Sequence, residues 1–189
     1  MSDQQIRELL NLLEAKGKAD LKQIKLPYTK TALAPVMSQG QIDLHYGKLY
    51  KGYVERFNSG EGDATFNEAG AFLHSLWFSQ FRTPKTSNKP TGQAETLINK
   101  KYGNFTAFKT ELKTQAMKLQ GSAWIYMSRN GEIKSFKNHQ KRTDIALLID
   151  WWEHAWIHDY GSNKSKYFDD LWRIIDWNVI NHRLAGSSA

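Results

Sequence analysis

The segment at residues 150–156 concentrates the side chains best suited to chemistry. It reads DWWEHAW, so Asp150 and His154 stand four residues apart directly after an apolar run. Burying an unpaired carboxylate among tryptophans is costly, and Asp150 must therefore be paired, hydrogen-bonded or bound to a cation. A local Asp150–His154 pair that caps a helix explains the spacing as well as a metal site does.

Two upstream histidines bear on that choice. His45 and His74 each fall on the apolar stripe of a predicted helix, where a lone histidine is usually a satisfied core residue. If both helices pack on the strand that ends at Asp150, one cation would account for both histidines and for the Asp150–His154 pair. Nitrogen and oxygen ligands of this kind suit iron or manganese.

Three helices are predicted in the N-terminal part. Ser2 and Gln5 form a capping box for a helix over residues 2–16. Residues 39–57 carry His45 on a stripe with Ile42, Leu49, Tyr53 and Phe57, and residues 66–81 carry His74 in a strongly aromatic and therefore buried helix. The stretch 83–91, with two prolines, is the best candidate boundary to the rest of the chain.

The remaining residues predict an α+β fold. Helices are expected at 92–102 and 105–119, strands at 122–128 and 133–137 around the Asn130-Gly131 hairpin signal, a buried strand at 145–149, and a helix at 167–184. We expect an N-terminal helical hairpin domain followed by a C-terminal domain with a small three-stranded antiparallel sheet and flanking helices. The predicted divisions are 1–25 (extra helix and linker), 26–88 (hairpin domain), 89–184 (α/β domain) and 185–189 (tail).

Composition narrows the function classes. The 189 residues include no cysteine, which excludes disulfides, thiolate zinc sites and cysteine nucleophiles. The formal net charge of +7 raises the local concentration of anions, but the basic residues are scattered, so we expect no nucleic-acid partner. The start lacks a secretory apolar stretch and no apolar run could span a bilayer, which predicts an intracellular, cytoplasmic protein with no membrane association.

Several different short motifs follow one another along the chain. They are Leu26-Pro27-Tyr28, His45-Tyr46-Gly47-Lys48 with Tyr53 eight residues after the histidine, Asn67, His74-Ser75-Leu76, Pro90-Thr91-Gly92, Gly121-Ser122-Ala123-Trp124, the string Asp150-x-Trp152-Glu153-His154-Ala155, Trp172 and Trp177. On these motifs the chain resembles the iron/manganese superoxide dismutases from about residue 26 to residue 184. The six-position string around Asp150 is the most specific of them.

The resemblance implies a redox enzyme. One iron or manganese ion per chain would be held by His45, His74, Asp150 and His154, with a solvent molecule in a fifth position. The substrate would be superoxide, converted to dioxygen and hydrogen peroxide. The alternative is a metal-binding protein of the same fold that has weak or no activity and an interaction role.

The resemblance also implies roles around the ion. Tyr53 would stand at the mouth of the access funnel, although a core tyrosine would show the same pattern. His139 or Gln140 would hydrogen-bond the metal-bound solvent, and we favour His139 because Gly70 lacks the side chain that fills this role in other members. An apolar wall around the site, also compatible with ordinary core aromatics, would be formed by Trp77, Phe78, Trp124 and Trp152.

Several positions depart from the family pattern. Leu49 and Ile157 replace a polar pair, commonly histidine and tyrosine, that bridges toward the gateway tyrosine across the subunit interface, and Gly161 stands where a basic residue is frequent. Glu153, which in the family reaches the metal-ligand histidine of the neighbouring subunit, is retained. We therefore expect a homodimer.

Overall fold

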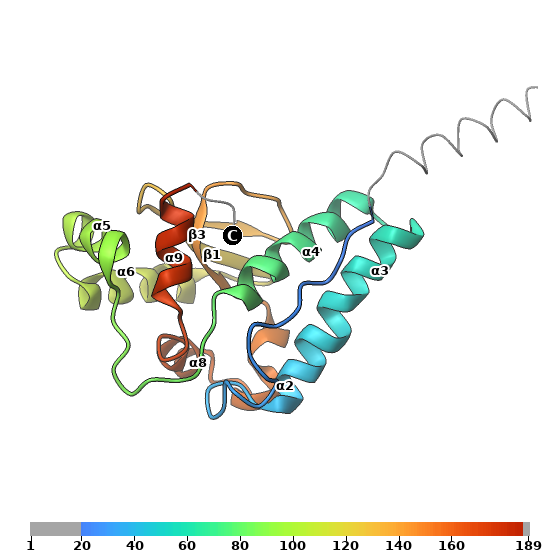
Figure 1. Ribbon diagram of the computed structural model, residues 1–189, viewed down its shortest axis with the longest axis horizontal. Helices are drawn as coiled ribbons and strands as arrows, with labels where there is room; N and C mark the ends of the chain where they lie inside the picture. Colours follow the sequence, from blue (N-terminus) through green and yellow to red (C-terminus); the bar gives the residue numbers. More distant parts are fainter. Residues whose placement is uncertain (1–19, 187–189) are drawn as a thin grey trace, which may run out of the picture.

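The N-terminal segment lies along a pair of helices. The structure is a computed structural model that describes residues 20–186, so the helix predicted over 2–16 falls outside the described residues. The chain from residue 20 onward runs in extended form beside the helical hairpin (Figure 1). Gln23 Nε2 donates to the Tyr46 carbonyl (2.6 Å), and the Tyr46 hydroxyl donates back to the Ile24 carbonyl (2.6 Å). These bonds attach the segment to the helix that carries His45.

The helix predicted over 39–57 contains an unpredicted π-helical turn. It consists of α2 (Gln39–Leu44), the π-helix η1 (His45–Tyr50) and α3 (Lys51–Ser59), which follow one another without a break. In a π turn each backbone hydrogen bond spans one more residue than in an α-helix, which rotates the side chains that follow. As a result Tyr50 is fully buried while Leu49, expected on the buried stripe, is partly exposed.

The second helix of the hairpin is α4 (Ala64–Ser79). Gly60 ends α3 in the left-handed conformation (φ 75°), and the Asp63 side chain caps α4 by accepting a bond from the Phe66 amide (2.9 Å). The helices α3 and α4 lie side by side as an antiparallel hairpin (Figure 1). The predicted helical hairpin is therefore confirmed.

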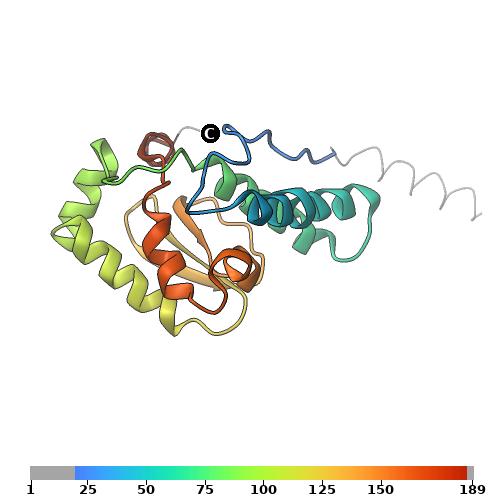
Figure 2. The ribbon, with the colours of Figure 1, turned by 90° about the horizontal axis from the view of Figure 1, so that it is seen from below.

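The C-terminal part contains the predicted sheet. After α5 (Gly92–Tyr102) and α6 (Phe105–Lys118), the strands β1 (Ala123–Ser128), β2 (Ile133–Lys137) and β3 (Ile145–Asp150) form an antiparallel sheet in the order β2-β1-β3. Figures 1 and 2 show this sheet between the α3–α4 hairpin on one side and α5 with α6 on the other. Every residue of β1 and β3 is buried, so these strands form the centre of the core.

The chain after β3 forms short helices. They are the 3₁₀ helix η2 (Glu153–Ala155), α7 (Ile157–Tyr160), α8 (Lys164–Leu171) and α9 (Trp177–Leu184). The single helix predicted over 167–184 is therefore wrong. The break arises because the Ile174 carbonyl accepts a bond from the Arg82 amide (2.8 Å) and Asp176 caps α9 through the Asn178 amide (3.0 Å). No helix within residues 20–186 is long and apolar enough to cross a membrane.

Candidate metal centre

Four side chains from four elements converge between the hairpin and the sheet. His45 begins η1, His74 lies in α4, Asp150 ends β3 and His154 lies in η2. One potential ligand atom from each lies within 4.8 Å of the others. Asp150 Oδ2 is 3.2 Å from His45 Nε2, 3.3 Å from His154 Nε2 and 3.9 Å from His74 Nε2. A strand end and three helices thus bring together residues separated by as many as 109 positions.

Hydrogen bonds to the surrounding chain orient these side chains. His74 Nδ1 lies 2.7 Å from the Gly70 carbonyl, so Nδ1 carries the proton and Nε2 presents its lone pair to the centre. Asp150 Oδ1 accepts a bond from the Trp152 amide (2.8 Å), which leaves Oδ2 facing the imidazoles. Gln41 Nε2 donates to the His154 carbonyl (2.7 Å) and ties η2 to α2.

The facing atoms themselves make no hydrogen bond. Nε2 of His45, His74 and His154, and Oδ2 of Asp150, are all buried without a hydrogen-bond partner in the structure. Buried polar atoms are rarely left unpaired, because each pays its desolvation without compensation. Four such atoms aimed at one point indicate a common ligand that accepts electron pairs.

The protonation states also suit a cation. Burial lowers the pKa of His45, and burial with the neighbouring His45 lowers the pKa of His74 further, so both imidazoles are neutral at neutral pH. Burial alone would raise the pKa of Asp150, but the imidazoles of His154 and His45 outweigh it and hold that pKa well below its ordinary value. Neutral imidazoles with an ionised carboxylate form a nitrogen–oxygen ligand set that fits iron or manganese.

His139 lies beside this cluster with an unused donor. Trp124 Nε1 donates to His139 Nδ1 (3.1 Å), so the proton of a neutral ring is on Nε2, which is buried without a partner. Burial lowers the pKa of His139 to about 4 and keeps the ring neutral. Trp152 stacks on it at 4.5 Å, and the ring of His74 is 5.7 Å away.

Tyr53 lies next to the same two histidines. Its ring centroid is 5.2 Å from that of His74 and 4.8 Å from that of His139. Burial and the negative charge of Asp150 raise the pKa of Tyr53 to about 12, so the phenol stays protonated at neutral pH. Within the described residues its hydroxyl has no hydrogen-bond partner, which leaves it free to donate or accept.

The other predicted site residues divide into two groups. Phe78 joins Trp124 and Trp152 near the cluster, with its ring 5.0 Å from that of His45. Trp77 instead packs its ring against Phe81 at 4.6 Å. Gln140 is exposed and donates to the Lys137 carbonyl (3.1 Å), and Glu153 is exposed beside the cluster. The structure brings none of these last three into contact with the centre.

Two neighbours were missed in the sequence. Tyr50 stacks on the His74 ring at 5.7 Å, and Phe66 lies 4.6 Å from the His139 ring. The π turn decides the position of Tyr50, and the sequence carries no plain signal for it. Phe66 begins the predicted helix that carries His74, so its aromatic character was the available signal.

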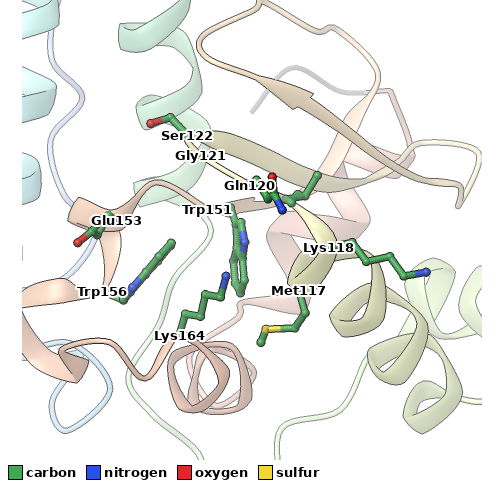
Figure 3. A pocket seen from close by; sticks show the side chains of 10 residues that line it. Met117, Lys118, Gln120, Gly121, Ser122, Trp151, Glu153, Trp156 and Lys164 are labelled. Carbon is green, nitrogen blue, oxygen red and sulfur yellow. The ribbon is translucent and has the colours of Figure 1, made fainter.

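A cavity of about 740 Å³ lies apart from the four candidate ligands, none of which lines it. It is bordered by the end of α6, the turn that leads into β1 and the segment after β3, and Figure 3 shows the side chains of Trp151 and Lys164 close together within it. Glu153 lines this cavity together with Ser122 and Met117. Glu153 therefore faces an outer surface of the chain.

The fold combines a helical hairpin with a small antiparallel sheet, and between them lie three histidines and one aspartate that form a candidate metal site. Family models for the alpha-hairpin domain and the C-terminal domain of iron/manganese superoxide dismutases match residues 21–64 and 90–183. The chain belongs to the iron/manganese superoxide dismutase family.

Individual relatives agree with this assignment. The chain is 35% identical over 187 residues to the Fe superoxide dismutase of Bacteroides fragilis (strain YCH46), and the match covers 85% of this chain and 97% of that protein. Identity to the Mn/Fe superoxide dismutase of Porphyromonas gingivalis (strain ATCC BAA-308 / W83) is 34%, with the same coverage. Identity to the Fe superoxide dismutase of Escherichia coli (strain K12) is 30%, covering 85% of this chain and 96% of that protein.

Proposed function

We propose that this protein is a superoxide dismutase with one iron or manganese ion per chain. The reaction converts two superoxide ions and two protons into one dioxygen and one hydrogen peroxide. The observation that carries the proposal is the group of four buried ligand atoms that point at one another and have no hydrogen bond. The family membership and the superoxide dismutases among the relatives support the same reaction.

His45, His74, Asp150 and His154 would hold the ion. When bound, iron or manganese supplies a one-electron redox couple, which the side chains of this protein lack. The nearly complete burial of the first three ligands keeps water and larger reductants away, whereas the His154 side chain is 18% exposed. Trp124, Trp152 and Phe78 would extend the apolar wall around the ion.

His139 and Tyr53 would manage the protons that peroxide formation consumes. The free Nε2–H of His139 is a donor suited to hold a solvent molecule beside the ligands. The Tyr53 phenol remains protonated at neutral pH and is unpaired among the described residues. A donor of this kind orients a small anion or passes it a proton.

Reconstitution tests the function. Protein prepared without metal should take up one equivalent of iron or manganese and then remove superoxide, and activity measured on each form identifies the metal that is used. His154→Ala should lose both metal and activity, since it removes one of four ligands. A folded, fully loaded protein that leaves superoxide untouched would instead support a metal-binding protein without turnover.

We further propose that the protein is a homodimer. Glu153 lies exposed beside His154, where it could reach a second copy, and it opens onto the cavity of Figure 3. Met117, which lines that cavity, is 42% exposed, and Ile157, four residues after Glu153, is 41% exposed. Burial of such side chains favours association. Sedimentation at micromolar concentration should give about twice the chain mass of 21.8 kDa, and a monomer would reject the proposal.

A further inference from the structure

Arg56 is held at the side of the metal centre by contacts that fix its direction. It lies in α3 one turn after Tyr53, and its guanidinium carbon is 5.0 Å from the centroid of the Tyr53 ring. Arg56 Nε donates to Asn67 Oδ1 (3.2 Å). Asn67 is itself buried, and its Nδ2 donates to the Glu61 carbonyl (2.9 Å). The start of α4 and the preceding loop therefore position the guanidinium of α3.

Gly52 makes room for this arrangement. A Cβ atom at Gly52 would lie 2.9 Å from Arg56 Nη1, so the arginine folds back along α3 over a residue that has no side chain. Stacking on Tyr53, the bond to Asn67 and the space above Gly52 together restrict a side chain that would otherwise be free in solution.

The charge of Arg56 is not neutralised within residues 20–186. No carboxylate there lies within 4.0 Å of its guanidinium. Two acids close to it in sequence have other contacts: Glu55 pairs with Lys51 (3.1 Å) and Asp63 caps α4. A half-buried cation thus stands against the aromatic ring that itself contacts His74 and His139.

We propose that Arg56 is an anion-docking residue of this chain, which attracts superoxide to the Tyr53 side of the metal centre and orients it there. The inference rests on the proposed dismutase function and adds a specific positioning residue to it. A fixed, unpaired cation against an aromatic ring beside the candidate site raises the local concentration of a small monoanion there. Gly161 stands where the family frequently has a basic residue, and glycine has no charged side chain. Arg56 would supply a positive charge in its place.

The matched control is Arg142. Its guanidinium carbon also lies over an aromatic ring, that of Phe136, at 5.7 Å, and its Nη2 donates to an amide oxygen, Gln140 Oε1 (2.6 Å). Arg142→Gln therefore removes the same charge and the same kinds of contact as Arg56→Gln, but away from Tyr53. Arg56→Lys keeps the charge and loses the planar fork.

The test measures two quantities on metal-loaded protein of verified metal content. The first is the dissociation constant of azide, a small monoanion, from absorption titration, and the second is kcat/KM for superoxide against ionic strength. Arg56→Gln should weaken azide binding about three- to tenfold and flatten the dependence of kcat/KM on salt. Arg142→Gln should change azide binding less than about twofold, and Arg56→Lys should lie between wild type and Arg56→Gln.

Equal effects of Arg56→Gln and Arg142→Gln on azide binding would overturn the proposal. If Arg56→Gln fails to hold metal, Arg56→Lys decides: azide binding weakened less than about threefold relative to wild type supports a charge effect, and azide binding weakened about threefold or more contradicts it. Azide titration does not need turnover. A protein that holds metal and binds azide through Arg56 but removes no superoxide would refute the dismutase function while leaving the anion site intact.

Discussion

Gly70 lies under the two rings that we assign to proton handling. A Cβ atom at this position would come within 2.9 Å of Tyr53 Cγ and 3.1 Å of His139 Cδ2. Both contacts are with ring atoms and not with the ends of flexible side chains. Gly70→Ala therefore forces Tyr53, His139 or α4 to move by several tenths of an ångström.

The change in the free energy of unfolding on Gly70→Ala follows from two opposing effects. Overpacking of this kind costs about 1–3 kcal/mol, and alanine recovers about 0.5–1 kcal/mol relative to glycine inside a helix. A net destabilisation of about 1 kcal/mol remains, which lowers Tm by roughly 2–4 °C in a protein of this size. Because both displaced rings contact the candidate ligand His74, turnover should fall about 10–100-fold.

Urea unfolding at matched metal content and a superoxide assay check this prediction. Gly47→Ala is the control, since a Cβ there meets nothing within 4 Å and the variant should be at least as stable as wild type. Gly70→Ala and His139→Ala together should cost less stability than the sum of the two single substitutions, without regaining activity, because one of the two crowded rings has been removed. A Gly70→Ala protein with the stability and turnover of wild type would refute the reasoning.

Two other predictions concern the same rings. Tyr53→Phe should retain the metal and lower turnover, because it removes only a hydroxyl that contacts no ligand; metal analysis that shows an empty site would contradict the role we give Tyr53. His139 has a folded-state pKa of about 4, below the ordinary value of about 6.5 in the unfolded chain. The unfolded chain therefore binds more protons between these values, and the stability that His139 contributes is present above about pH 6.5 and is lost as the pH falls through about 4. In metal-free protein His139→Gln should lose less stability than wild type over that range, and identical losses in urea unfolding would count against the assignment.

Much of the site could be predicted from local patterns. His45 and His74 on apolar stripes, and Asp150 with His154 after an apolar run, identified the four converging residues because a buried polar side chain needs a partner wherever it lies. The strand bounds followed from short apolar runs around Asn130-Gly131. These features depend on patterns among residues close in sequence, and such patterns are visible in one amino-acid sequence.

Other features were decided only by tertiary contacts. The break between α8 and α9 needs the backbone of residues 80–82, nearly a hundred positions earlier. The π turn selects Tyr50 instead of Leu49 for the core, and the position of Arg56 depends on Asn67 from another helix. The amino-acid sequence by itself determined which groups must be buried and paired. Their partners were set by packing between distant segments, because a helix or strand pattern shows which face is apolar but not which element will cover it.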